Sequence, residues 1–185
     1  MDIMTAILTR RSVGRLTADV VSRELIQQLL EAGNAAPNHH KVRPWRFVVL
    51  TGSARERLGD ALAASLLDRK PDAPQEALNK ARASSLRAPV LIAVGVDPAE
   101  EGKTDEIENI CAAAAACENI LLAAHVLGLG AKWRTDGVND AQVKELLGFA
   151  ADQHIVGFMF VGYAESESMP YVRPAVDDRV SWMES

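Results

Sequence analysis

Cysteine is scarce in this sequence of 185 residues, which holds only Cys111 and Cys117. Both fall in one predicted helix, where a spacing of six residues places their side chains about 120° apart around the axis. Side chains that diverge in this way suit neither a disulfide nor a shared metal ion. We therefore expect both cysteines to be small residues of the core.

Basic residues are also fewer than acidic residues. The chain carries 20 Lys and Arg residues against 25 Asp and Glu residues, for a net charge of -5 at pH 7. Proteins that bind nucleic acid or an anionic membrane need a basic surface to displace counterions. The acidic balance argues against both kinds of partner, and any site for an anion has to be local.

The sequence predicts neither a signal peptide nor a membrane span. It begins MDIMTAILTRR, with an acid at position 2 and a short apolar run that Thr5 interrupts. The longest apolar stretch, residues 105–130, contains Glu118, Asn119 and His125, and one charge at the centre of a span costs about 2.5 to 3.5 kcal/mol. We expect this stretch to be a buried helix of a cytoplasmic protein. Its alanines at 112–116 let a second backbone approach closely, either in the core or across a two-fold axis.

The usual catalytic motifs are missing as well. The sequence has no GxSxG, HExxH, CxxC or Walker loop, and the GxG at 128–130 follows a helix, the reverse of the dinucleotide-binding order. His39 and His40 are adjacent, so their side chains should diverge on extended backbone, and no third metal ligand is evident. An enzyme with no nucleophile, metal or acid pair needs a cofactor for its chemistry.

What the sequence does have is the composition of one globular domain over residues 1–185. Hydrophobic residues make up 48% of the chain and charged residues 24%, and a chain of this length buries about 70% of its unfolded surface. Apolar periodicity predicts helices at 2–9, 23–32, 53–68, 105–130 and after 139, with strands at 46–52, 90–96, 131–135 and 154–163. Strands that alternate with helices give a layered α/β or α+β fold.

Capping residues set the expected helix boundaries. Ser22 should start the second helix and Gly33 should end it, with Val21 and Ile26 packed together at its start. A capping box of Ser53 and Glu56 should open the third helix, and Asn139 with Gln142 the last one. Residues 68–89, where prolines bracket a weaker helical piece, are expected to form a mobile flap.

RRSVGRL at residues 10–16 sets two arginines beside a hydroxyl. Adjacent guanidinium groups repel each other and add little to a core, so the pattern is typical of an anion site. On extended backbone Arg10 and Ser12 project to one side and can meet on one phosphate, while Arg11 projects to the other. The alternative is that both arginines only complement the C-terminus of the first helix, worth up to about 1 kcal/mol.

Four blocks of sequence occur in the order and spacing of a known family. They are RRSVGRL at 10–16, AGNAAPNHHKVRPWRFVVL at 32–50, GLGAKWRT at 128–135 and IVGFMFVGYAESE at 155–167. Each block alone is weak, but the four together resemble the FMN-dependent nitroreductases, most closely the small YdjA-like branch of NAD(P)H nitroreductases. Residues 60–105 contribute nothing to the resemblance.

The resemblance implies a fold and a mode of action. The fold would be α+β in three layers, with a mostly antiparallel or mixed sheet flanked by helices and two chains intertwined as a homodimer. FMN would be the bound cofactor, NAD(P)H the hydride donor, and a nitroaromatic or quinone-like electrophile the acceptor, in a ping-pong cycle through flavin N5. No side chain is then expected to be catalytic, because the flavin carries the chemistry.

The resemblance also implies which residues bind the cofactor. Those of the first block hold the phosphate and ribityl chain, those of the second reach into the partner chain's site, and those of the third lie at the ring. One residue near the C-terminus matches a basic phosphate-binding position of larger relatives. The full set is Arg10, Arg11, Ser12, His39, Arg43, Trp133, Arg134, Thr135 and Arg173.

Several points stay open at the level of sequence. Family members often carry a longer polar residue in place of Ala35, and the lysine that accompanies Arg173 in larger relatives is missing. Trp133 could be a core residue instead, and Pro44 and Trp45 are taken as a rigid turn and an aromatic anchor. Arg134 or a main-chain amide would stabilise negative charge near flavin N1.

Three other functions fit the same residues. The scaffold could support reductive dehalogenation or dehydrogenation, it could be a non-catalytic flavin or nucleotide carrier, or it could be a structural dimer with no ligand. Neither the physiological acceptor nor a preference for NADH or NADPH follows from the sequence, which has no recognisable site for a 2′-phosphate.

Overall fold

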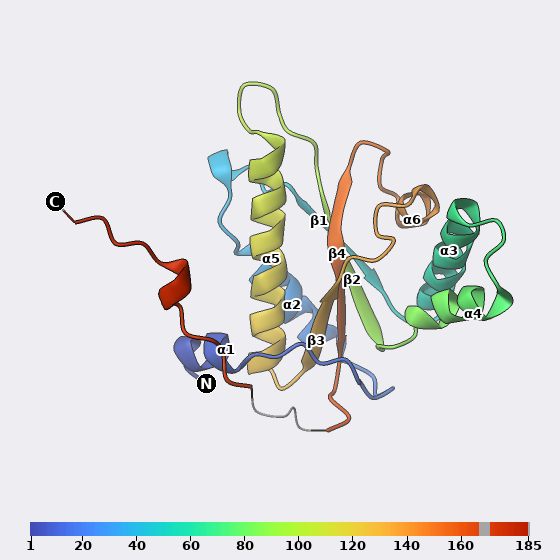
Figure 1. The fold of residues 1–185 in the computed structure, drawn as a ribbon, viewed down its shortest axis with the longest axis horizontal. Helices are drawn as coiled ribbons and strands as arrows, with labels where there is room; N and C mark the ends of the chain where they lie inside the picture. The colour runs from blue at the N-terminus through green and yellow to red at the C-terminus, as the bar shows by residue number, and fades with distance from the viewer. Residues whose placement is uncertain (167–170, 185) are drawn as a thin grey trace.

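The computed structural model describes residues 1–166 and 171–184 and consists of one sheet between two layers of helices (Figure 1). All strand pairs are antiparallel, in the order β1-β2-β4-β3. The strands are β1 (Trp45–Leu50), β2 (Val90–Val96), β3 (Gly130–Arg134) and β4 (His154–Gly162). The expected three-layer α+β fold with a mostly antiparallel sheet is confirmed. Glu167, the last residue of the fourth sequence block, lies outside the described residues.

The two faces of the sheet carry different helices. α2 and α5 cover one face, with α1 at one end of α5, and α3, α4 and α6 lie on the other side (Figure 1). The helices are α1 (Ile3–Thr9), α2 (Arg23–Asn34), α3 (Ser53–Arg69), α4 (Gln75–Ser84), α5 (Glu106–Val126) and α6 (Ala141–Leu147). Short 3-10 turns occur at His39–Lys41 and Asp177–Arg179.

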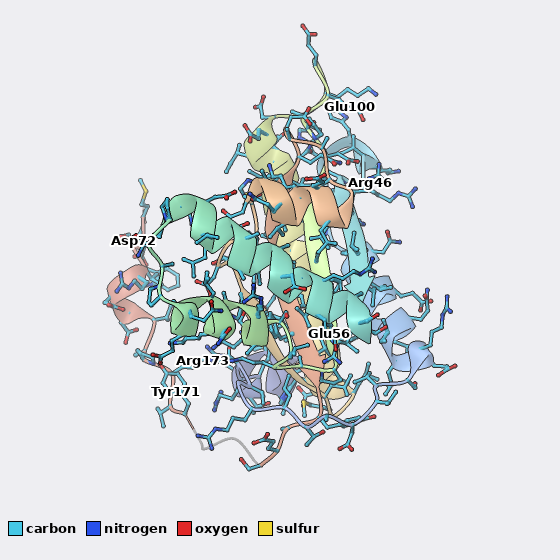
Figure 2. The ribbon with its side chains drawn as sticks, turned by 90° about the vertical axis from the view of Figure 1, so that its right-hand side faces the viewer. Arg46, Glu56, Asp72, Glu100, Tyr171 and Arg173 are labelled. Carbon is cyan, nitrogen blue, oxygen red and sulfur yellow. The ribbon has the colours of Figure 1, made fainter. Side chains whose placement is uncertain are left out.

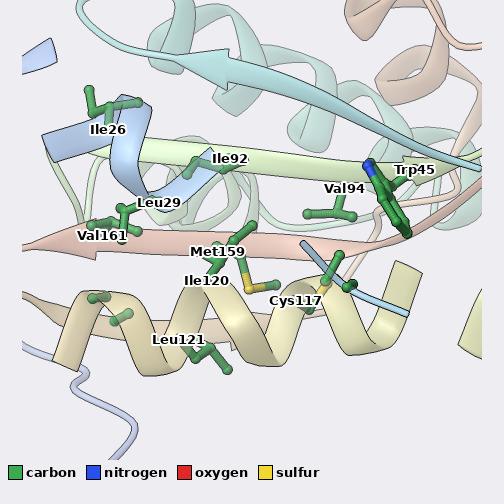
Figure 3. Packing of buried hydrophobic residues seen from close by; sticks show 14 of the residues in the cluster. Ile26, Leu29, Trp45, Ile92, Val94, Cys117, Ile120, Leu121, Met159 and Val161 are labelled. Carbon is green, nitrogen blue, oxygen red and sulfur yellow. The ribbon is translucent and has the colours of Figure 1, made fainter. Parts of the chain in front are cut away.

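β2 is buried along its whole length, as its uninterrupted apolar sequence predicts. Ile92 and Val94 face α2 and α5, whereas Leu91 and Ala93 face the layer with α3 and α6. Figure 3 shows the first of these two cores, where Met159 of β4 packs between the sheet and α5. The alternation of β2 therefore joins two separate cores into one domain.

α5 is the central helix of its layer. By length and composition it could cross a membrane, but it packs on the sheet and buries a continuous face: Asn109, Ala112, Ala113, Ala116, Cys117, Ile120, Leu121 and Ala124. α2 approaches it closely, because Gly33 has no Cβ; one built there would lie 3.0 Å from the Ile120 side chain. Asn119 Nδ2 donates to Ala32 O at 3.0 Å and ties the two helices together.

Two expectations about these elements are wrong. Gly33 does not end α2, which continues to Asn34, because the glycine serves helix packing. Cys111 is exposed in this chain, on the side of α5 that faces away from the sheet, and only Cys117 is buried. Between residues 68 and 89, α4 forms the expected helical piece and packs on α3, and the mobility expected for this region stays a prediction.

The capping predictions are partly confirmed. Ser22 accepts a hydrogen bond from Leu25 N at 3.3 Å and starts α2 as expected. No such bond is formed by Ser53, because it is already the first residue of α3 and Gly52 stands at the cap with φ +53. At α6 the cap is Asp140, and Asn139 instead accepts from Ile155 N at 2.7 Å, which secures the start of β4.

Candidate functional site

The RRSVGRL segment is held as an extended strip along an edge of the sheet. α1 ends at Thr9, and the chain then runs beside β3, where Ser12 bridges Ala131 and Val13 N donates to Ala131 O at 2.9 Å. Gly130 makes this approach possible, since a Cβ there would lie 2.7 Å from Leu16. The strip is therefore fixed by backbone contacts.

The two adjacent arginines have different partners. Arg10 Nε forms an ion pair with Glu118 Oε1 of α5 at 3.0 Å. Arg11 Nη2 donates to Tyr171 O at 3.0 Å, and its guanidinium carbon lies 5.5 Å from the centre of the Tyr171 ring. Arg173 Nη2 in turn donates to Arg10 O at 3.2 Å. Three arginines from the two ends of the chain thus share one corner, where Figure 2 labels Tyr171 and Arg173.

This corner fits a phosphate. Within the described residues, Arg11 Nε is buried and has no hydrogen-bond partner, which is costly for a charged group unless a ligand supplies an acceptor. The Ser12 side chain lies on the exposed part of the same strip. Glu118 is the carboxylate paired with Arg10, and its side chain is 45% exposed. The group retains excess positive charge for a dianion.

His125 belongs to the same corner, although no sequence motif singled it out. Its Nε2 lies 2.8 Å from Thr9 Oγ1, and that hydroxyl already donates to Thr5 O at 2.6 Å, so the imidazole is the donor in the contact. Burial, followed by the charges of Arg10 and Arg11, lowers the pKa of His125. The side chain therefore remains neutral at neutral pH.

His39 and Arg43 lie elsewhere in the chain. His39 Nδ1 is 2.7 Å from Glu108 Oε1 near the start of α5, and this interaction, after the hydrogen bond from the Asp105 backbone, lowers the pKa of Glu108. Glu108 and Glu118 are ten residues apart, about 15 Å along the helix. One chain therefore does not bring His39 to the arginine corner.

The loop that carries these residues has an unusual backbone. His40, Lys41 and Arg43 have positive φ values of 48°, 57° and 48°, a conformation that costs energy for residues other than glycine and is common at functional sites. As a result the rings of His39 and His40 stack at 4.2 Å instead of diverging as expected. In the part of the chain that the structure describes, no three His, Cys, Asp or Glu side chains are grouped to hold a metal.

The third block places its residues on both sides of β3. Trp133 Nε1 donates to Val156 O at 3.2 Å, and its ring lies over Gly157, where a Cβ would come within 2.1 Å of it. This placement matches the alternative that Trp133 is a packing residue. Arg134 points to the other side, pairs with Asp136 at 2.7 Å and lies over the Phe160 ring. Thr135 is exposed just beyond the strand.

Of the two other residues of the corner, Glu118 left a weak signal in the sequence and Tyr171 left none. Glu118 is an acid within an apolar helix, and a carboxylate in such a place is usually paired. Tyr171 contributes a carbonyl oxygen and a ring face, and neither role has a sequence pattern. The position of the C-terminal segment against α1 is therefore a tertiary feature.

Comparison with known proteins agrees with these observations. The Nitroreductase family profile matches residues 7–163. The chain is 32% identical over 163 residues to the Escherichia coli protein named "Putative NAD(P)H nitroreductase YdjA", with 88% of each chain covered.

Solved structures show the same likeness. The Nitroreductase-like Family Protein from Bacillus cereus has a TM-score of 0.86 at 27% identity and covers all of this chain and 97% of its own. A "putative nitroreductase in complex with FMN" from Desulfovibrio desulfuricans has a TM-score of 0.76 at 29% identity, with 100% and 99% covered. The chain described here belongs to the Nitroreductase family.

Proposed function

We propose that this protein is an FMN-dependent oxidoreductase that takes a hydride from NADH or NADPH and reduces a small electrophile such as a nitroaromatic or a quinone. The observation that carries the proposal is the corner formed by Arg10, Arg11 and Arg173, where one guanidinium nitrogen is buried without a partner among the described residues. A relative of known structure binds FMN, and the FMN phosphate is an anion suited to this corner.

The arginines divide the work of holding the phosphate. Arg11 is fixed by two carbonyl oxygens, those of Arg10 and Tyr171, which leave its Nε as the nitrogen without a partner among the described residues. Arg10 is partly neutralised by Glu118 and would exchange that carboxylate for the phosphate. A guanidinium that donates to phosphate forms charge-assisted hydrogen bonds, which are roughly twice as strong as neutral ones.

Trp133, Arg134 and Thr135, at the end of β3 and just beyond it, would hold the flavin ring. When bound, FMN would supply the redox chemistry, which is hydride transfer between the nicotinamide and the acceptor. Arg134 would stabilise negative charge near N1 with its guanidinium, after giving up part of its contact with exposed Asp136. The main-chain amides after Arg134 are the other candidates for this task.

The proposed functional unit is a homodimer with FMN at the subunit interface. His39 and Arg43 are remote from the arginine corner of their own chain, so they can serve a flavin only from a second copy. α5 also has an outward face of small and apolar residues that one chain leaves open: Ile107, Cys111 and Ala114. A two-fold contact along this face would bury it.

A spectrum tests the proposal. The purified protein, reconstituted with FMN and freed of excess cofactor, should be yellow, and anaerobic NADH or NADPH should bleach it. Subsequent addition of a nitroaromatic or a quinone should restore the colour. Retention of colour with both nicotinamides would instead indicate a flavin carrier, and a protein that takes up no FMN would contradict the proposal altogether.

A further inference from the structure

A cavity of about 350 Å³ lies on the face of the sheet opposite α5, between α3, α4 and the strands β3 and β4. Figure 2 views the molecule from this side, with α3 and α4 in front of the sheet. An apolar cavity of about 150 Å³ holds benzene, so this one has room for a compound with one or two rings. Its wall is apolar: Leu58, Leu62, Leu66, Ala81, Phe158 and Phe160.

The rim of the cavity is basic, in a chain with a net charge of -5. Arg69 is paired with Asp140, and Arg134 with Asp136. The other two cations at the rim, Lys80 and Arg87, form no salt bridge with a carboxylate within residues 1–166 and 171–184. An apolar interior beneath unpaired cations is complementary to a molecule with an apolar body and one negative group.

We propose that this cavity is a binding site for an aromatic carboxylate. Its ring would lie against Phe158 and Phe160, since aromatic pairs gain energy beyond the area that they bury. Its carboxylate would meet Arg87, whose planar fork can donate two parallel hydrogen bonds to one carboxylate, with Lys80 as a second cation. No step of this binding requires FMN.

The cavity adjoins the arginine strip without being part of it. Arg87, Arg134 and Phe160 also line a small hollow of about 20 Å³ whose other wall contains Val13 and Gly14. Most of the cavity wall, however, comes from α3 and α4, which carry none of the expected cofactor residues. A bound carboxylate would therefore lie beside Arg134 and could affect the proposed flavin site through it.

Equilibrium titration with 2-naphthoate tests the site, and uncharged 2-naphthamide serves as the matched compound. The wild-type protein should bind naphthoate at least about tenfold more tightly than naphthamide, because the amide lacks the charge that Arg87 and Lys80 recognise. Arg87→Gln should weaken naphthoate binding about tenfold or more and leave naphthamide binding unchanged. Arg57→Gln, at an exposed arginine of α3 outside the cavity, should change neither.

A substitution that fills the cavity provides a second test of the binding site. Ala81→Phe places a ring in the cavity from α4 and should abolish binding of both compounds, while circular dichroism shows that the fold is retained. Equal affinity of naphthoate for wild-type, Arg87→Gln and Ala81→Phe proteins would overturn the proposal, as would a wild-type Kd above about 10 mM.

The same titration is repeated with FMN-saturated protein. Unchanged naphthoate affinity supports a separate site. Complete displacement of naphthoate by FMN would overturn the proposal, because the cavity would then be part of the flavin site, and the proposed redox function would be unaffected. Failure of FMN to bind, with naphthoate still bound, would contradict the proposed function alone.

Discussion

At the scale of residues, the two neighbouring arginines of RRSVGRL contact different parts of the protein. Arg10 reaches α5 through Glu118, whereas Arg11 reaches the C-terminal segment through Tyr171. A helix-terminus role alone would leave both guanidiniums at the end of α1. Their tertiary partners instead separate them, and Arg11 Nε is left buried without a hydrogen-bond partner among the described residues.

Replacement of Arg10 tests the phosphate role. Arg10→Ala removes charge-assisted hydrogen bonds worth about 1.5 to 3 kcal/mol each, so FMN affinity should fall about ten- to hundredfold or more. Fluorescence titration with FMN measures the change. Arg15→Ala removes an exposed arginine of the same strip and should leave affinity within about twofold. An unchanged Kd for Arg10→Ala would remove Arg10 from the site.

Substitution of Gly157, which lies beneath the Trp133 ring, tests whether Trp133 is a packing residue. Gly157→Ala introduces a Cβ 2.1 Å from Trp133 Nε1 and 2.9 Å from Arg134 O, and overpacking of this kind costs about 1 to 3 kcal/mol. Urea denaturation should show this loss in the free energy of unfolding. Gly14→Ala is the control, since its Cβ meets nothing within 4 Å. Equal stability of the two variants would show that Trp133 is loosely packed.

At the scale of elements, α5 serves several functions at once. Its inner face completes the core, its first turn has a capping box formed by Asp105 and Glu108, and its last turn carries His125 beside the arginine corner. The helix therefore links the loop with His39 to the strip with Arg10. A substitution at one end of α5 is therefore expected to alter both the side-chain positions at the candidate site and the packing of the core.

His125 makes the stability of the folded protein depend on pH. Its pKa is lowered from 6.5 in the folded protein by burial and then by Arg10 and Arg11, so the unfolded chain binds more protons as pH falls. Stability from the neutral imidazole is fully present above pH 6.5 and is lost as pH falls through the folded pKa. Between about pH 7.5 and pH 5.5, flavin-free wild-type protein should lose more stability than His125→Gln.

Thermal unfolding at the two pH values measures that difference. Carboxylates that titrate in the same range are common to both proteins, so they cancel in the comparison. The flavin-free form is needed because a phosphate dianion beside His125 would favour the protonated imidazole. A His125→Gln protein that loses as much stability as wild type would show that His125 does not titrate in this window.

At the scale of the whole molecule, one chain leaves apolar surface open on the side of α1 and α5. The exposed large side chains there include Ile3, Met4, Leu8 and Ile107. On the same face of α5, Cys111 is exposed and Ala114 is half-buried. Exposed large apolar side chains on one side of a protein are typical of an interface between subunits.

A bulky charge on this face tests the proposed dimer. Ala114→Arg places a guanidinium where two copies of α5 would meet, and an unpaired charge in an interface is strongly unfavourable. The variant should elute as a monomer in size-exclusion chromatography with light scattering, and its FMN affinity should fall because His39 of a second copy is lost. Ala64→Arg, at an exposed position of α3, should remain dimeric. An Ala114→Arg dimer, or a monomer with full FMN affinity, would contradict a shared site.

The sequence by itself determined the elements and the kind of site. The continuous apolar run of β2, the Ser22 cap of α2 and the paired arginines are local signals, because period, capping chemistry and charge depend on near neighbours along the chain. They predicted most strands and helices, and the four blocks predicted the family.

Only the tertiary structure decided which residues meet. Gly33 looked like a helix stop and is a packing contact with Ile120, and Cys111 looked like a core residue and is exposed. The contact of Arg11 with Tyr171 spans 160 residues, and the basic rim of the α3–α4 cavity joins residues of α3, α4, the segment before β2 and the end of β3. Such pairings arise when the layers close over the sheet, so they leave no periodic or local pattern in the chain.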